Sequence, residues 1–76
     1  MRIERLITMA NDIGAFFASD PDRRSAAGNV ANHLQRFWDP RMRHQIVAHY
    51  REGGAGLKEI PLAAIALLAD DGAQSD

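Results

Sequence analysis

The chain contains no cysteine, so neither disulfide bonds nor thiolate metal sites can hold it together. Its 76 residues suffice for one small domain. A domain of this size buries only about 60–65% of the surface that its unfolded chain exposes. Because the core is thin and has no covalent staple, such a chain often draws part of its stability from a partner protein.

Long apolar runs are also absent. The longest, residues 60–69, is about half of the ~18–20 residues needed to span a bilayer. The first six residues carry charges of both signs and none of the apolar stretch of a secretory signal. We therefore expect a cytoplasmic protein with no membrane-spanning segment.

Neither sign of charge dominates, since nine basic and ten acidic residues give a formal net charge of −1. Four arginines are nevertheless clustered and suggest a helix-turn-helix DNA reader: Arg36, Arg41, Arg43 and Arg51. The low net charge and the lack of a helix dense in Lys and Arg favour a solvated or partner-facing surface instead. We expect no binding of nucleic acid, and a small nucleic-acid-binding or regulatory module is the alternative.

Residue types that support catalysis or metal binding are scattered. The three histidines, His33, His44 and His49, show none of the spacing of a metal site and have no carboxylate at ligand distance along a helix. None of the serines lies in a nucleophile elbow. The glycines at 53–56 lack the Lys-Ser/Thr that ends a phosphate-binding loop. We therefore expect no catalytic, cofactor-binding or metal site in this chain.

Alanine and leucine are common, while valine, threonine and aromatic residues are scarce, which favours helix over strand. Apolar residues recur every three or four positions in the first three segments, which is the period of an amphipathic helix. The fold class we predict is all-α, a small bundle of three to four short helices in one domain, 1–69, with a flexible acidic tail, 70–76. The predicted helices are about 2–18, 21–38, 40–51 and 61–69.

Prolines and glycines mark the predicted boundaries. Asp20-Pro21 and Asp39-Pro40 each predict a helix start, because aspartate accepts free backbone N–H groups and proline suits the first turn. The glycines at 53–56 predict a flexible loop after the third helix.

Two features of the predicted helices are unusual. Gly28 lies inside the second helix, where glycine costs about 1 kcal/mol relative to alanine, and we expect it to allow close packing against a neighbouring helix. The fourth helix is apolar at every position from Leu62 to Ala69. A helix that is apolar all round is buried on more than one side, which is hard to arrange in so small a chain without a partner.

The most informative segment joins the second and third helices. It consists of Phe37, Trp38, Asp39, Pro40, Arg41, Met42 and Arg43. Two large rings end one helix, and two arginines begin the next, where the helix dipole disfavours cations. Arginine with tryptophan and methionine is typical of an interface core. Two interpretations stay open: a partner interface, or a tryptophan in the domain core with the arginines in water.

Two motifs of the chain are informative together: Met9-Ala10-Asn11-Asp12-Ile13-Gly14-Ala15-Phe16-Phe17 and His33-Leu34-Gln35-Arg36-Phe37-Trp38-Asp39-Pro40-Arg41-Met42-Arg43. With them the chain resembles, over about residues 3–69, the small delta subunit of NAD-dependent, molybdenum- or tungsten-containing formate dehydrogenase.

This resemblance implies a non-catalytic accessory subunit that supports assembly or stability of the holoenzyme. Its partner would be the large catalytic subunit, with residues 37–43 as the interface and residues 62–69 as a second contact. The resemblance also implies that molybdopterin, iron–sulfur clusters, FMN and NAD are held on other subunits of the complex, and that this chain holds no cofactor.

Overall fold

The computed structural model describes the backbone of residues 2–75 and the side chains of residues 2–70. Over this range the chain forms four α-helices and no strand: α1 (Ile3–Phe17), α2 (Arg23–Phe37), α3 (Pro40–Arg51) and α4 (Glu59–Ser75). The prediction of a small all-α bundle is confirmed. Among the described residues, none of these helices combines the length and the apolar character that crossing a membrane requires.

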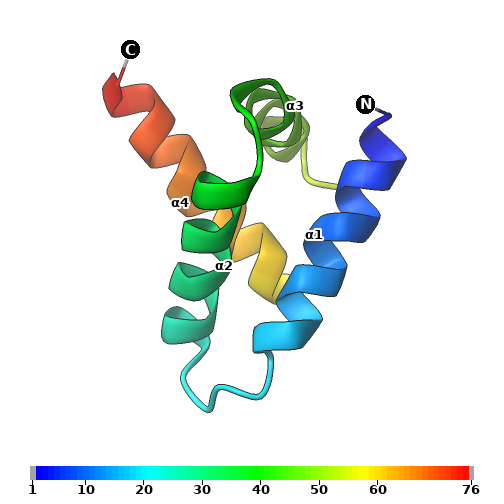
Figure 1. Cartoon of the computed structure of the whole chain (residues 1–76). Helices are drawn as coiled ribbons and strands as arrows, with labels where there is room; N and C mark the ends of the chain where they lie inside the picture. The colour runs from blue at the N-terminus through cyan, green and yellow to red at the C-terminus, as the bar shows by residue number, and fades with distance from the viewer. Residues whose placement is uncertain (1, 76) are drawn as a thin grey trace.

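Helix α4 packs against α1, α2 and α3, and its contact with α2 is the most extensive between any two helices. Figure 1 shows α1 and α2 meeting at the turn of residues 18–22, with α3 lying across their far ends. Between Ile60 and Ala69, only Ala63 and Leu67 are exposed. The chain's own helices therefore bury most of the all-apolar segment that we expected to require a partner.

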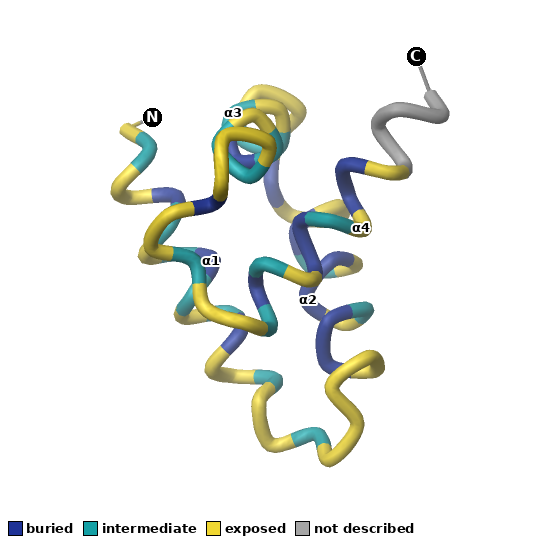
Figure 2. Tube along the Cα trace, turned by 180° about the vertical axis from the view of Figure 1, so that it is seen from behind, coloured by how far each residue is buried: buried dark blue, intermediate teal, exposed yellow. Residues whose placement is uncertain are grey.

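The core is built from one face of each helix. In α1 the buried residues Leu6, Ala10 and Gly14 follow at intervals of four, which places them on one side. In Figure 2 buried and exposed stretches alternate along the tube, as expected of helices that turn one face to a shared core. The large side chains that are fully buried come from all four helices: Leu6, Val30, Leu34, Ile46 and Ile65.

The contact between α1 and α4 requires a glycine. A Cβ atom added at Gly14 would lie 2.5 Å from Cγ and 2.7 Å from Cδ of Pro61. No real Cβ atom tolerates that distance, and the proline ring is held rigidly by the backbone. The missing side chain of Gly14 therefore lets the first turn of α4 press directly on α1.

The loop between α3 and α4, expected to be flexible, is instead held by side chains. The amide nitrogen of Asn11 donates to the carbonyl of Gly56 at 2.9 Å, and its Oδ1 accepts the N–H of Lys58 at 3.0 Å. The Nε2 atom of His49 lies 2.7 Å from the carbonyl oxygen of Ala55. Helix α1 and helix α3 thus both fix this loop and, through it, the start of α4.

The predicted boundaries of α1 and α3 agree with the structure to within one residue, whereas α2 begins later than predicted. It begins at Arg23, because Asp22 is the cap and its carboxylate accepts the N–H of Arg24 at 2.9 Å. Asp20 accepts the N–H of Asp22 at 3.0 Å and forms the turn around Pro21, so the proline lies before the helix rather than in it.

Helix α4 is longer than predicted at both ends. It begins at Glu59 rather than at 61, since the carbonyl of Lys58 accepts the N–H of Leu62 at 2.9 Å. Pro61 is tolerated because the first turn of a helix leaves its N–H groups without intrahelical partners. The backbone stays helical to Ser75 instead of ending at 69. The predicted flexible acidic tail covers residues 70–76, of which only Asp70 has a described side chain. The flexibility of this tail therefore stays a prediction.

The expected role of Gly28 is wrong. A Cβ atom added there would have nothing within 4 Å, so no helix packs closely against this glycine.

The two helical glycines should respond in opposite ways to alanine. We expect Gly14→Ala to lower the free energy of unfolding by about 1–3 kcal/mol through overpacking against Pro61. Gly28→Ala should raise it by about 0.5–1 kcal/mol, because alanine restricts the unfolded chain and meets no clash. Urea denaturation of both variants tests this, and equal effects at the two positions would contradict the packing described.

Candidate docking surface

The segment from Phe37 to Arg43 is divided between the inside and the outside of the protein. Trp38 is only 5% exposed and belongs to the hydrophobic core, and Met42 packs against that core. Phe37 is 69% exposed. Of the two interpretations left open by the sequence, Trp38 follows the core one. The interface assigned to residues 37–43 as a whole stays a prediction.

The end of α2 explains why neighbouring aromatic residues point in different directions. Phe37 is the last helical residue, while Trp38 is extended, with φ −86° and ψ 140°, and its N–H still donates to the carbonyl of Leu34. The next two residues start α3. The carboxylate of Asp39 accepts the N–H of Met42 at 2.9 Å, and Pro40 occupies the first turn. The change from helical to extended backbone is what separates the two rings.

Arg43 has a structural role that its position in α3 conceals. Its guanidinium donates to the carbonyl of Gln35 at 3.2 Å and to the carbonyl of Trp38. Both carbonyls lie at the C-terminal end of α2, where a cation is favoured by the helix dipole and by the unpaired acceptors. The cation that looks misplaced at the start of α3 is therefore well placed for α2.

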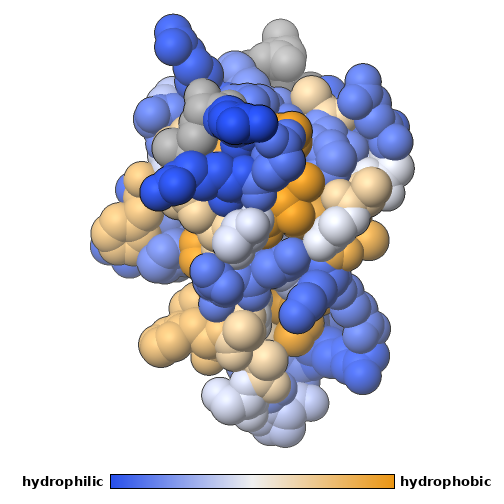
Figure 3. All heavy atoms as spheres, turned by 90° about the vertical axis from the view of Figure 1, so that its right-hand side faces the viewer, coloured by the Kyte–Doolittle hydropathy of each residue, from blue (hydrophilic) through white to orange (hydrophobic). Residues whose placement is uncertain are grey.

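An aromatic cluster reaches the surface beside this junction. The ring centroids of Phe37 and His33 are 4.7 Å apart, those of His33 and Phe17 are 6.4 Å apart, and those of Phe17 and Phe16 are 5.1 Å apart. The guanidinium of Arg36 lies 5.8 Å from the Phe37 centroid. We call these five residues the aromatic surface. Figure 3 shows the α1 side of the molecule, where hydrophobic atoms reach the surface beside hydrophilic ones.

The aromatic surface combines large exposed rings with one cation, Arg36. Phe16 is 77% exposed. Among the described residues, Phe16 and Phe37 are two of the few large apolar side chains that are exposed to solvent. Burying a phenylalanine side chain is favourable by about 1.5–3 kcal/mol of free energy. A partner that covered both exposed rings would therefore gain a large binding free energy. Outside this surface, Arg41 at the start of α3 is exposed and has no ion pair or hydrogen bond among residues 2–70. Such a patch suits an apolar partner pocket with an acidic rim.

The sequence contained a weak signal for this surface. Phe16 and His33 lie just beside the apolar stripes of their helices. The sequence therefore did not show whether either side chain packs against a neighbouring helix. Only the packing of α1 on α2 brings Phe17 and His33 together.

The four arginines that suggested nucleic-acid binding are not all free to contact a ligand. Arg43 is bound to the end of α2, and Arg36 lies against the ring of Phe37. No group of three or more His, Cys, Asp or Glu side chains within the described part of the chain is placed to hold a metal ion.

Comparison with known proteins identifies the family. The chain matches the family model for the NADH-dependent formate dehydrogenase delta subunit, FdsD, over residues 5–65. The chain belongs to this family. No curated protein and no solved structure matches it. The resemblance that the two sequence motifs indicated is confirmed, and the matched range includes both of them.

The two motifs of the delta subunit divide by role. Asn11 and Gly14 attach α4 and its loop to α1, while Asp39 and Arg43 join α2 to α3. These residues build the fold. Phe16 and Phe37 belong to the same motifs, yet the fold leaves both rings in solvent. The exposed members are thus the ones available for contact with the complex.

Arg41 and Arg43 form a matched pair for testing the junction. Arg43→Met should destabilise the delta subunit by about 1–3 kcal/mol, because it leaves carbonyls at the end of α2 without their donor. Arg41→Met removes the same charge from an exposed side chain and should stay within about 0.5 kcal/mol of the parent. Thermal and urea unfolding measure both. If Arg43→Met were as stable as Arg41→Met, the junction would not depend on this guanidinium.

Proposed function

We propose that the delta subunit is a non-catalytic accessory subunit of a cytoplasmic NAD-dependent formate dehydrogenase. In this role it docks on the large catalytic subunit and supports assembly or stability of the holoenzyme. The observation that carries the proposal is the aromatic surface, in which Phe16 and Phe37 stay exposed although the helices enclose a core of their own. Membership of the delta-subunit family supports the same complex as the partner.

Within residues 37–43, the outward side chains make the contact and the inward ones position them. Phe37 is the anchor, because exposed aromatic rings that become fully buried dominate interface energies. Arg36 and Arg41 pair with carboxylates around the pocket that receives the ring. Trp38 acts from inside by holding the backbone that presents Phe37.

We further propose that molybdopterin, iron–sulfur clusters, FMN and NAD are carried by the other subunits. The composition supports this division, since a chain without cysteine offers no thiolate for a cluster and the sequence has no glycine-rich dinucleotide motif. The delta subunit then contributes free energy of association to the complex, and the other subunits carry out the reaction.

Removal of the subunit tests the role directly. We expect a strain that lacks this chain to yield less assembled formate dehydrogenase, or a complex that dissociates and loses formate oxidation at lower temperature. Purification by a tag on the catalytic subunit, size-exclusion chromatography and an activity assay after heating measure both effects. Complex of unchanged yield, stability and activity would contradict the accessory role.

Point variants separate the contact from the fold. Phe37→Ala should weaken binding to the delta-depleted complex by about 2 kcal/mol, roughly thirty-fold, while leaving the unfolding midpoint nearly unchanged because the ring is exposed. Trp38→Ala should instead destabilise the subunit itself by about 3–5 kcal/mol. Titration calorimetry and thermal unfolding distinguish the two.

Arg51→Ala, at an exposed position of the last turn of α3, is the control and should change neither quantity. Wild-type affinity for Phe37→Ala would remove this ring from the interface. Salt-sensitive binding of duplex DNA by the wild-type subunit would favour the nucleic-acid alternative instead.

A further inference from the structure

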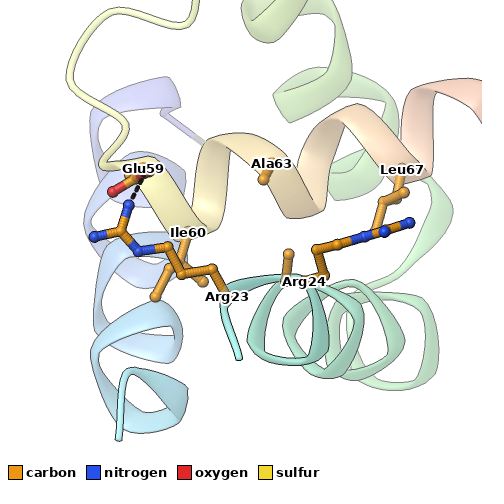
Figure 4. A pocket seen from close by; sticks show the side chains of 7 residues that line it. Arg23, Arg24, Glu59, Ile60, Ala63 and Leu67 are labelled. Atoms are coloured by element: carbon orange, nitrogen blue, oxygen red, sulfur yellow. Dashed lines mark hydrogen bonds and ion pairs between the residues drawn. The ribbon is translucent and has the colours of Figure 1, made fainter. Parts of the chain in front are cut away.

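A second surface, formed by α2 and α4, is built differently from the aromatic surface. A groove of about 230 Å³ lies between the two helices and is lined by Arg23, Arg24, Glu59, Ile60, Ala63 and Leu67, as Figure 4 shows. Leu67 is 43% exposed. The groove therefore has an apolar floor from α4 between charged side chains at its rim.

The charges at the rim are unequal. Arg23 forms an ion pair with Glu59 at one end of the groove, so its charge is compensated. In Figure 4 the side chain of Arg24 extends in the other direction, toward Leu67. No carboxylate pairs with Arg24 among the residues whose side chains are described, 2–70. Within residues 2–70, the first hollow thus offers the guanidinium of Arg24, without an ion pair, beside aliphatic surface.

Gly28 extends the groove. The next hollow between α2 and α4 shares Leu67 with the first and is also lined by Gly28, Ala31, Asn32, Gln35 and, at its α4 end, the carboxylate of Asp70. Glycine weakens a helix relative to alanine, yet no neighbour in the described part of the chain needs the space that its missing side chain leaves. What the glycine does provide is helix backbone open to close approach from outside.

The dimensions indicate what kind of ligand fits. The two hollows follow α2 from Arg23 to Gln35, which at 1.5 Å per residue is about 18 Å. That length accommodates about five residues of extended chain. The apolar hollow alone is smaller than the roughly 300–1,000 Å³ typical of small-molecule sites, and it suits one aliphatic side chain.

We propose that this groove binds an extended peptide segment of another subunit of formate dehydrogenase, in which an aliphatic side chain is followed closely by a carboxylate. The aliphatic side chain packs on Ile60 and Ala63, the carboxylate pairs with Arg24, and the segment's backbone passes over Gly28. The inference rests on the proposed function, since it assumes that the delta subunit docks on that complex. It adds a second contact with its own chemistry.

Two variants test the groove in binding to the delta-depleted complex. We expect Arg24→Glu to weaken binding at least tenfold, because it replaces attraction with repulsion, while an acidic residue in the first turn of α2 suits the helix dipole. Gly28→Ala should weaken binding at least threefold although it raises the thermal midpoint of the free subunit. Arg5→Glu, the same charge reversal at an exposed site of α1, is the control and should stay within twofold.

A photo-reactive phenylalanine analogue at position 67 identifies the segment. After irradiation of the assembled complex, mass spectrometry should find the cross-link on a subunit segment that holds both aliphatic and acidic residues. A cross-link to a second delta subunit, or to a segment without acidic residues, would overturn the proposal. So would wild-type affinity for Arg24→Glu and Gly28→Ala while Phe37→Ala still weakens binding, a result that leaves the proposed function intact. If the wild-type subunit itself does not bind, the proposed function fails first and the groove proposal falls with it.

Discussion

The structure depends on burying a helix that has no polar face between Leu62 and Ala69. Helix α4 achieves this by passing among the other three helices, so that only Ala63 and Leu67 stay exposed between Ile60 and Ala69. Such a position requires α1 to come very close, and Gly14 makes the approach possible by offering no side chain to Pro61. Asn11 then fixes the loop that delivers α4 to this place. In a chain without cysteine, these contacts take over the role that a covalent staple has in other small domains.

Much of what identifies the family consequently serves the fold. Trp38 fills the core, Asp39 starts α3, and Arg43 binds the end of α2. The aromatic surface and the groove, by contrast, are not needed to build the fold. Each contains a feature that the isolated subunit does not need, the exposed rings of Phe16 and Phe37 in one and the open glycine of α2 in the other. Features that cost stability without an internal use are the physical basis for assigning both surfaces to a partner.

The two surfaces also differ in the chemistry they offer. The aromatic surface presents flat rings and a cation, which suits a pocket that encloses a large side chain. The groove presents helix backbone, an aliphatic floor and the guanidinium of Arg24, which forms no ion pair within residues 2–70, and this combination suits an extended segment. Because one lies along α1 and α2 and the other along α2 and α4, α2 contributes to both. Under the two proposals, α2 would contact two elements of the complex, which suits a subunit that stabilises assembly.

Local patterns in the sequence were enough to predict the all-α class, the bounds of α3, the capping role of Asp39 and, through two motifs, the family. Each of these rests on residues close together in the chain. The remaining features depend on contacts over long separations, such as the bond from Asn11 to the carbonyl of Gly56, forty-five residues away. The same reason explains the errors. Whether Trp38 or Phe37 faces inward is decided by where α2 stops being helical. Whether Gly28 is covered is decided by which part of α2 the other helices contact. Neither quantity is encoded in the spacing of apolar residues, so only the packed arrangement of the helices could settle them.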